Sequence, residues 1–83
     1  MKKEKLLKKI LSSPENCRFQ DLLALARAFG FHLVRISGSH HILAHLELRE
    51  LINLQDRKGR AKPYQIRQLL DLVEDHDIWF EED

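Results

Sequence analysis

Apolar residues recur at helical spacing in three parts of the chain. Residues 3–11 place apolar side chains on one side of a helix and lysines on the other. Residues 18–29 follow the i, i+3, i+4, i+7 pattern, and Gly30 supplies the left-handed residue that commonly ends a helix. A third stripe follows Pro63, which suits the first position of a helix; its members are Ile66, Leu69, Leu70 and Val73. The pattern predicts three helices. We expect the first to pack on the protein, because about nine residues bury too little surface to bind a membrane strongly.

The stretch between the second and third helices favours β-structure. Residues 31–37 and 39–45 are two β-favouring runs, and Gly38 separates them, which predicts a hairpin. A third strand is predicted at residues 50–55, whereas residues 46–49 fit either a loop or a helical turn. The order helix, helix, three strands, helix predicts an α+β fold with the helices on one face of a three-stranded antiparallel sheet.

The length of 83 residues suits one domain and is too short for two. We expect a single domain over residues 1–83, with a core at 18–76, an added N-terminal helix at 3–11 and an acidic tail at 77–83. The single cysteine, Cys17, has no intrachain partner, which favours a reducing compartment, the cytoplasm. No apolar run approaches the roughly 18 residues of a membrane span, so we expect no contact with a membrane.

The net charge of +1 conceals an uneven distribution. Residues 1–73 hold 14 basic and seven acidic residues, a net charge of +7, while residues 74–83 hold six acidic residues and no basic one. A basic body can attract a phosphate backbone, although a solvated surface with an acidic end explains the same composition. The acidic tail includes Trp79 and Phe80. As a further hypothesis, it would occupy the basic surface of the same chain and compete weakly with RNA for that surface.

Three histidines lie close together in the predicted hairpin: His40, His41 and His45. A shared metal ion is disfavoured, because in a strand His41 and His45 stand about 13 Å apart and His40 points to the opposite face. Acid–base catalysis on RNA is the second hypothesis. RNA brings its own nucleophile, the 2′-hydroxyl, and an imidazole can both take and give a proton near neutral pH.

His40 is the candidate for that proton transfer. It follows Gly38 and Ser39, where a phosphate can approach the backbone closely and Ser39 adds a hydroxyl and an N–H. Arg35, on the partner strand, is a candidate phosphate contact. Further candidates come from the basic loop at residues 56–62, namely Arg57, Lys58, Arg60 and Lys62. Histidine, serine and glycine are also ordinary hairpin residues, so a purely structural explanation stays open.

The residues of the hairpin also match a family signature. Gly30-Phe31, followed by Val34-Arg35-Ile36-Ser37-Gly38-Ser39-His40-His41, resembles the signature of HicA messenger-RNA interferase toxins. The similarity covers roughly residues 16–76 and includes the segments 52–55, 58–65 and 66–70. Two positions depart from many relatives, which have an aromatic residue where this chain has Leu43 and a proline where it has Leu46.

The resemblance implies a double-stranded-RNA-binding-like α-β-β-β-α fold and ribonuclease activity on messenger RNA. It also implies neutralisation by a HicB antitoxin that covers the active site, and no metal or organic cofactor. The histidine that follows Gly-Ser is the catalytic one in the family, which assigns that role to His40. We therefore expect a metal-independent endoribonuclease toxin of a toxin–antitoxin system. A non-catalytic RNA-binding module and a protein-interaction domain are the alternatives.

Overall fold

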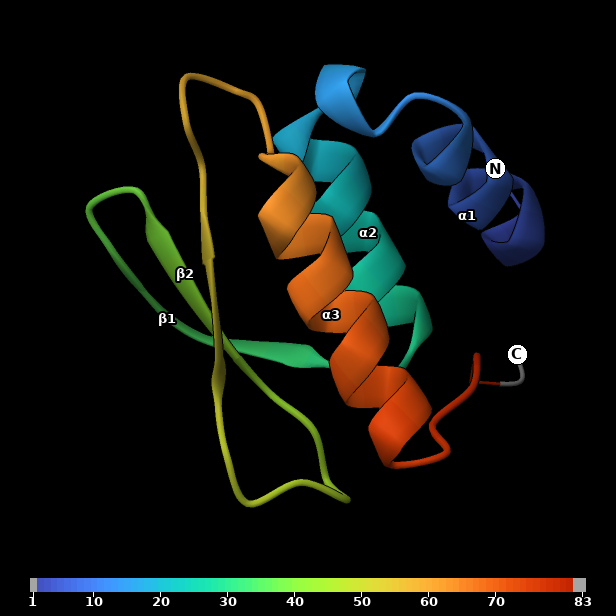
Figure 1. The fold of residues 1–83 in the computed structure, drawn as a ribbon. Helices are drawn as coiled ribbons and strands as arrows, with labels where there is room; N and C mark the ends of the chain where they lie inside the picture. Colours follow the sequence, from blue (N-terminus) through green and yellow to red (C-terminus); the bar gives the residue numbers. More distant parts are fainter. Residues whose placement is uncertain (1, 82–83) are drawn as a thin grey trace.

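The predicted order of helices and strands is present in the computed structural model, which describes residues 2–81 (Figure 1). Its elements are α1 (Lys3–Ser12), the single 3₁₀ turn η1 (Pro14–Asn16), α2 (Phe19–Ala28), β1 (His32–Ser37), β2 (His40–Ala44), β3 (Ile52–Gln55) and α3 (Pro63–Asp75). The α+β prediction is confirmed. Residues 46–49 form turns instead of a helix, with the Leu48 N–H donating to the His45 carbonyl at 3.0 Å. Strand β3 begins at Ile52, two residues later than predicted.

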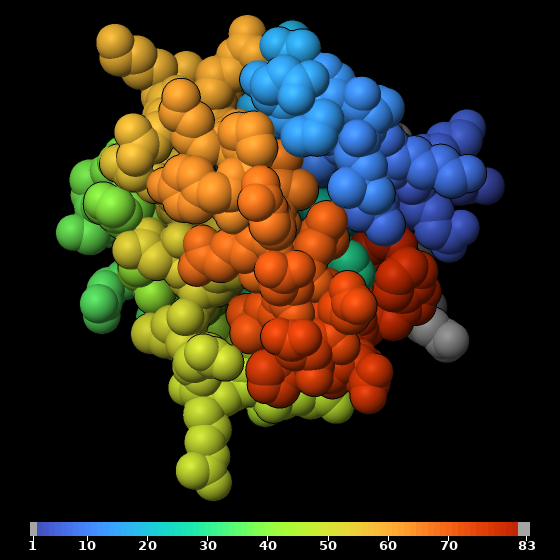
Figure 2. All heavy atoms as spheres, in the orientation of Figure 1, coloured from blue at the N-terminus to red at the C-terminus, as the bar shows by residue number. Residues whose placement is uncertain are grey.

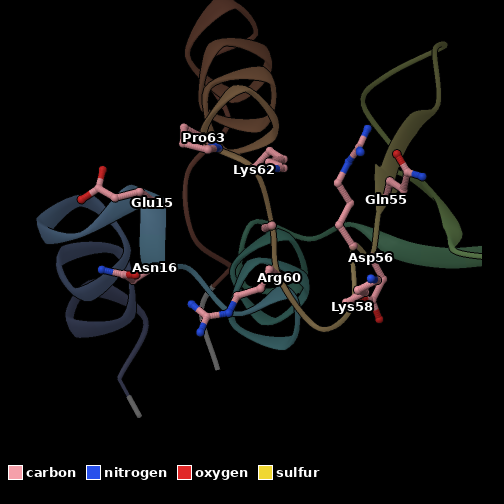
Figure 3. Close-up of a pocket in the computed structure, with 10 residues that line it drawn as sticks. Glu15, Asn16, Gln55, Asp56, Lys58, Arg60, Lys62 and Pro63 are labelled. Atoms are coloured by element: carbon pink, nitrogen blue, oxygen red, sulfur yellow. The ribbon is translucent and has the colours of Figure 1, made fainter.

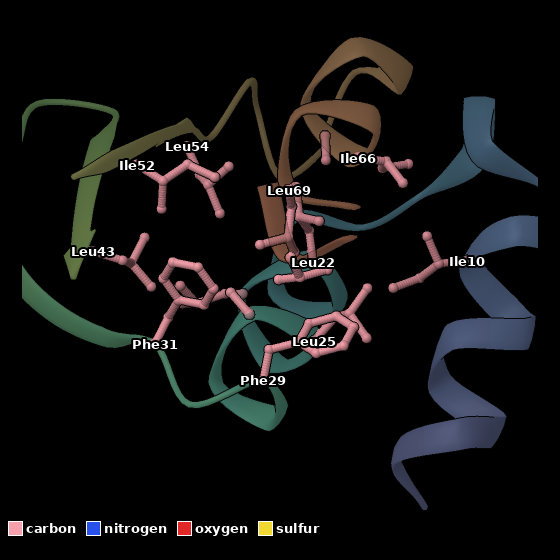
Figure 4. Close-up of a cluster of buried hydrophobic side chains, with 14 of the residues drawn as sticks. Ile10, Leu22, Leu25, Phe29, Phe31, Leu43, Ile52, Leu54, Ile66 and Leu69 are labelled. Carbon is pink, nitrogen blue, oxygen red and sulfur yellow. The ribbon is translucent and has the colours of Figure 1, made fainter. Parts of the chain in front are cut away.

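The helices form two layers on one face of the sheet. Figure 1 shows α2 and α3 beside the sheet and α1 on their far side. Helix α2 is buried on most of its circumference, as expected for a helix packed on both sides. The core between these layers draws side chains from the sheet and all three helices (Figure 4), including Ile10, Leu22, Leu25, Phe31, Leu43, Ile52, Leu54, Ile66 and Leu69. Because Leu6 and Ile10 are buried, α1 is the packing helix that its stripe predicts.

The sheet is antiparallel throughout, in the order β1-β2-β3. Ser37 pairs with His40 around a tight turn in which Gly38 has a φ of 60°. The register shifts between Leu33 and Arg35, so one extra residue bulges from β1. A bulge of one residue exchanges the faces of every side chain that follows it on the strand. The shift therefore decides which side of the sheet Arg35 occupies.

A buried glutamine fastens α3 to the end of β3. Gln65 is 1% exposed, and its Oε1 accepts a hydrogen bond from the Gln55 N–H at 2.5 Å. Its Nε2 donates to the Gln55 carbonyl at 2.9 Å. The side-chain amide thus satisfies both backbone groups of Gln55 much as a neighbouring strand would. This fixes the point where the chain leaves the sheet and enters the basic loop.

Replacing Gln65 with leucine should lower the free energy of unfolding by about 2–3 kcal/mol. The substitution leaves the Gln55 N–H and carbonyl without their protein partners, and an unsatisfied buried polar group costs roughly 1–3 kcal/mol. Urea unfolding monitored by circular dichroism measures the loss. Gln68→Leu is the matched control, because Gln68 is exposed on the same helix and should change stability by less than about 0.5 kcal/mol. Equal losses in the two variants would contradict this role for Gln65.

The segment after α3 packs on the helices, away from the sheet and the basic loop at residues 56–62. Ile78 is buried, and the Phe80 ring stacks on Phe29 with centroids 4.6 Å apart. The Glu81 N–H donates to the Ala28 carbonyl at 2.9 Å, and Lys3 Nζ donates to the Glu81 carbonyl. Figure 1 shows this segment on the side of the helices that faces away from the sheet.

The hypothesis that the acidic tail competes with RNA in cis is therefore wrong for residues 77–81. The physical reason is that Ile78 is buried in the core and Phe80 packs on Phe29, the residue after α2, so the backbone of this segment follows the helices. Residues 82–83 lie outside the described residues. The sequence showed the apolar residues, but it did not show the surface that accepts them.

Deleting residues 77–83 should destabilise the protein by about 2–4 kcal/mol and leave RNA affinity close to wild type at about 0.15 M salt, where the acidic charges that the deletion removes are largely screened. The deletion exposes the surface under Ile78 and Phe80, and a fully buried large apolar side chain contributes roughly 1.5–3 kcal/mol. Urea unfolding and RNA titration of the same preparation measure the two quantities. Tighter RNA binding by the truncated chain would revive the competition hypothesis.

Candidate nucleic-acid interface

The sheet has one face against the helices and one open face. Side chains alternate between the two faces along each strand. Leu43, Ile52 and Leu54 are buried against the helices. The pairs Ser37–His40, Arg35–Ile42, Ile42–Asn53 and His40–Gln55 consequently have their side chains on the open face.

The bulge in β1 brings Arg35 to this open face. Arg35 pairs with Ile42, so His40, two residues before Ile42, is its diagonal neighbour across the hairpin. Diagonal neighbours on one face have Cα atoms roughly 7–8 Å apart, within reach of a long side chain. Without the extra residue at Val34, Arg35 would point to the helix side. The register therefore places Arg35 and His40 on the same face of the sheet, and the role of Arg35 as a phosphate contact stays a prediction.

The His40 imidazole is exposed at the end of the hairpin. Its Nδ1 lies 3.1 Å from Oδ1 of Asn53, an exposed residue of β3. Within the described part of the chain, Nε2 has no hydrogen-bond partner. The ring is thus held at one nitrogen and open to solvent at the other.

The neighbouring histidines, His41 and His45, pack against core side chains on the other face of the sheet from His40. The half-buried His41 ring packs on Phe19 with centroids 4.7 Å apart, and its Nδ1 lies 3.3 Å from the Ser39 carbonyl. His45 Nε2 lies 3.0 Å from the Phe29 carbonyl, while its Nδ1 accepts a hydrogen bond from the Glu47 N–H at 3.0 Å. Among residues 2–81, no three histidine, cysteine or acidic side chains are grouped so that they could hold a metal ion.

The basic loop is an ordered tight turn. Arg57 and Arg60 exchange two backbone hydrogen bonds of 3.0 Å. Lys58 and Gly59, between them, have φ values of 54° and 83°, which are typical of a two-residue hairpin turn. The Asp56 carboxylate accepts a hydrogen bond from the Gly59 N–H at 2.6 Å. The cations of the loop are therefore presented from a fixed backbone.

Backbone hydrogen bonds join this turn to the start of α2. They place Arg18 beside the loop cations, a neighbour that the sequence did not predict. The Phe19 N–H donates to the Gly59 carbonyl at 2.9 Å, and the Ala61 N–H donates to the Cys17 carbonyl at 3.0 Å. The exposed Arg18 pairs with Arg60 between these two bonds. Nothing in the sequence pattern links Arg18 to the loop, since the two are distant in the chain.

The loop and the hairpin meet at Ser39. The Asp56 N–H donates to the Ser39 carbonyl at 2.8 Å, and Gln55 Nε2 donates to the Ser39 hydroxyl at 3.3 Å. Ser39, the residue before His40, is thus hydrogen-bonded to Asp56, the first residue of the loop. The predicted contact of Ser39 with RNA stays a prediction.

A depression of about 860 Å³ lies along the loop. Figure 3 shows Glu15 and Asn16 on one side of it and the loop side chains on the other. In the space-filling view the loop, in orange, borders the light-blue segment that contains η1 (Figure 2). The four loop cations predicted from the sequence all line this depression, and each is exposed: Arg57, Lys58, Arg60 and Lys62.

Cys17 is not a nucleophile of this site. Its thiol is buried beneath the loop, and burial, together with the carboxylate of Asp21, raises the pKa of the Cys17 thiol above its ordinary value. A thiol must ionise to attack, so a raised pKa keeps it inert near neutral pH.

Comparison with known proteins identifies one family. A family model described as the HicA toxin of bacterial toxin–antitoxin systems matches residues 19–74, which run from the first residue of α2 almost to the end of α3. Searches of curated proteins and of solved structures found no significant match. No helix between residues 2 and 81 is long and apolar enough to cross a membrane. The matched region contains His40, Arg35 and all four loop cations, whereas α1 and Arg18 precede it.

Proposed function

Because the chain belongs to the HicA toxin family, and so is a toxin whose partner is an antitoxin, we propose that it is a metal-independent endoribonuclease that cleaves messenger RNA. The observation that carries the proposal is the exposed His40 ring, open at Nε2, on the same sheet face as Arg35 and joined through Ser39 to an ordered cationic loop. Such a surface offers both a proton-transfer group and phosphate-binding groups.

His40 would act as the general base. Its Nε2 takes the proton from a ribose 2′-hydroxyl, the 2′-oxygen attacks the adjacent phosphorus, and the bond from phosphorus to the 5′-oxygen breaks. The leaving 5′-oxygen takes a proton from water or from the imidazolium. The products are a 2′,3′-cyclic phosphate and a 5′-hydroxyl. Proton transfer by a positioned side chain contributes typically about 10²–10⁴-fold to a rate.

The cations would bind the phosphodiester and stabilise the charge that develops on it. Arg35 lies beside His40, and the loop presents four further cations with Arg18 next to them. Arginine and lysine contacts to phosphate release counterions, so RNA affinity should fall steeply as salt rises. We further propose that Ser39 positions the substrate, and that the antitoxin is a HicB-like protein that covers this face in the cytoplasm.

The test is cleavage of a defined RNA by the purified full chain in the presence of a metal chelator. We expect products that end in a 2′,3′-cyclic phosphate, and no cut where the ribose at the cleaved bond is replaced by 2′-deoxyribose. Products with a 5′-phosphate would overturn the 2′-hydroxyl mechanism, because they require an attacking water. Salt-dependent RNA binding without any cleavage would replace the nuclease with a non-catalytic RNA-binding module.

A further inference from the structure

Asn53 is the one residue between positions 2 and 81 whose side chain holds the His40 ring. Its Oδ1 lies 3.1 Å from His40 Nδ1 on the open face of the sheet. We propose that Asn53 is a positioning residue, which keeps the proton of the neutral imidazole on Nδ1 and leaves Nε2 as the proton acceptor. This inference rests on the ribonuclease function proposed above.

The chemistry of the amide decides the tautomer. An amide oxygen can only accept a hydrogen bond, so Nδ1 must donate, and a neutral imidazole carries one proton. Nε2 then has a lone pair directed to solvent. When Nε2 takes a proton, Nδ1 still donates to the same oxygen, so the ring keeps its orientation through both steps of a proton transfer.

The strands make this contact rigid. Asn53 pairs with Ile42 and His40 pairs with Gln55, so the two side chains are diagonal neighbours on β2 and β3. Gln65 fixes the backbone of Gln55 from one side, and Ser39 fixes the loop that follows it from the other. Groups carried on paired strands are held more accurately than groups carried on loops.

The charged groups near His40 supply no substitute for Asn53. Ser37 and Gln55, the direct neighbours of His40 on β1 and β3, make no hydrogen bond to its ring among residues 2–81. Arg35, the diagonal neighbour of His40 on β1, is a donor only and cannot accept the Nδ1 proton. The carboxylate of the loop, Asp56, accepts a hydrogen bond from the Gly59 N–H. Loss of the Asn53 amide should therefore release the ring to both tautomers and to several orientations.

The test measures the tautomer and the reaction on the same full-length samples. The ¹⁵N chemical shifts of the His40 ring report the position of the proton without any RNA. We compare wild type with Asn53→Leu, Asn53→Asp and the control Gln68→Leu, which places a leucine on a different exposed surface. Wild type should carry the proton on Nδ1, and Asn53→Leu should show mixed tautomers and a kcat roughly 10–100-fold lower, with RNA affinity unchanged.

Asn53→Asp separates positioning from structure. A carboxylate also accepts the Nδ1 proton, so it should restore the wild-type tautomer and most of the rate. Its charge favours the imidazolium, so the acid limb of the pH–rate profile should move to higher pH. A purely structural role for Asn53 would leave the tautomer unchanged in both variants.

Two results would overturn the proposal. One is a wild-type His40 with its proton on Nε2, which would mean that the Asn53 amide is turned and donates to Nδ1. The other is an Asn53→Leu variant with the wild-type tautomer and rate. Either result leaves the ribonuclease function intact if wild type cleaves RNA, whereas a wild type that does not cleave overturns both proposals.

Discussion

Replacing His40 with alanine is expected to lower the rate of RNA cleavage by about 10²–10⁴-fold, the usual contribution of a positioned proton-transfer group. The effect should appear in kcat, because the imidazole moves protons in the transition state, while the phosphate is bound by other side chains. Timed digestion of a labelled RNA under saturating protein, with wild type and variant side by side, measures the difference.

RNA affinity and stability should survive this substitution. The His40 side chain is exposed, and exposed substitutions usually change stability by less than about 0.5 kcal/mol. Arg35 and the loop cations remain in place, so the dissociation constant and its salt dependence should stay close to wild type. His76→Ala is the matched control, because His76 is an exposed histidine at the far end of α3. Cleavage by His40→Ala at the wild-type rate would show that the nuclease centre lies elsewhere.

Replacing Gly30 with alanine is expected to lower the free energy of unfolding by about 2–6 kcal/mol. Gly30 has a φ of 98°, which strains any L side chain, at roughly 1–3 kcal/mol. A Cβ would also lie 2.9 Å from His45 Nε2 and 3.1 Å from the Glu81 carboxyl group. His45 would have to move and lose its hydrogen bond to the Phe29 carbonyl, which adds roughly 1–3 kcal/mol.

Gly59→Ala isolates the steric part of this effect. Gly59 has a similar φ of 83°, but a Cβ there would meet nothing within 4 Å. Urea unfolding should therefore show a clearly smaller loss for Gly59→Ala than for Gly30→Ala. A similar loss in the two variants would mean that backbone strain alone matters and that the space around His45 and Glu81 can adapt.

The fold was predictable because its local signals agree. Each helix carries one apolar stripe and an end signal, such as Gly30 or Pro63, and the hairpin carries a glycine where the chain must turn. The start of β3 and the turns at residues 46–49 were less clear, because residues 46–51 show neither a helical nor a strand repeat of apolar positions. Strand alternation also predicted that His40 faces away from His41.

The site was predictable only in part, because several of its features depend on contacts between distant residues. A run of β-favouring residues gives no sign of the bulge that turns Arg35 toward His40. In the sequence, Asn53 looks like any other strand residue. Only the pairing of β2 with β3 shows that it lies beside the His40 imidazole. Arg18 joins the loop only through backbone pairing. The burial of the tail on Phe29 likewise depends on a surface that forms only in the folded chain.

The contact between Lys3 and Glu81 joins the two ends of the described chain on the side opposite the open sheet face. A fluorophore, an affinity tag or a linker to a solid support attached beside Lys3 or Glu81 would lie on the side away from His40 and the cationic loop. An immobilised sample would thus present the same face to RNA and to an antitoxin, and both could be titrated on it without hindrance from the attachment.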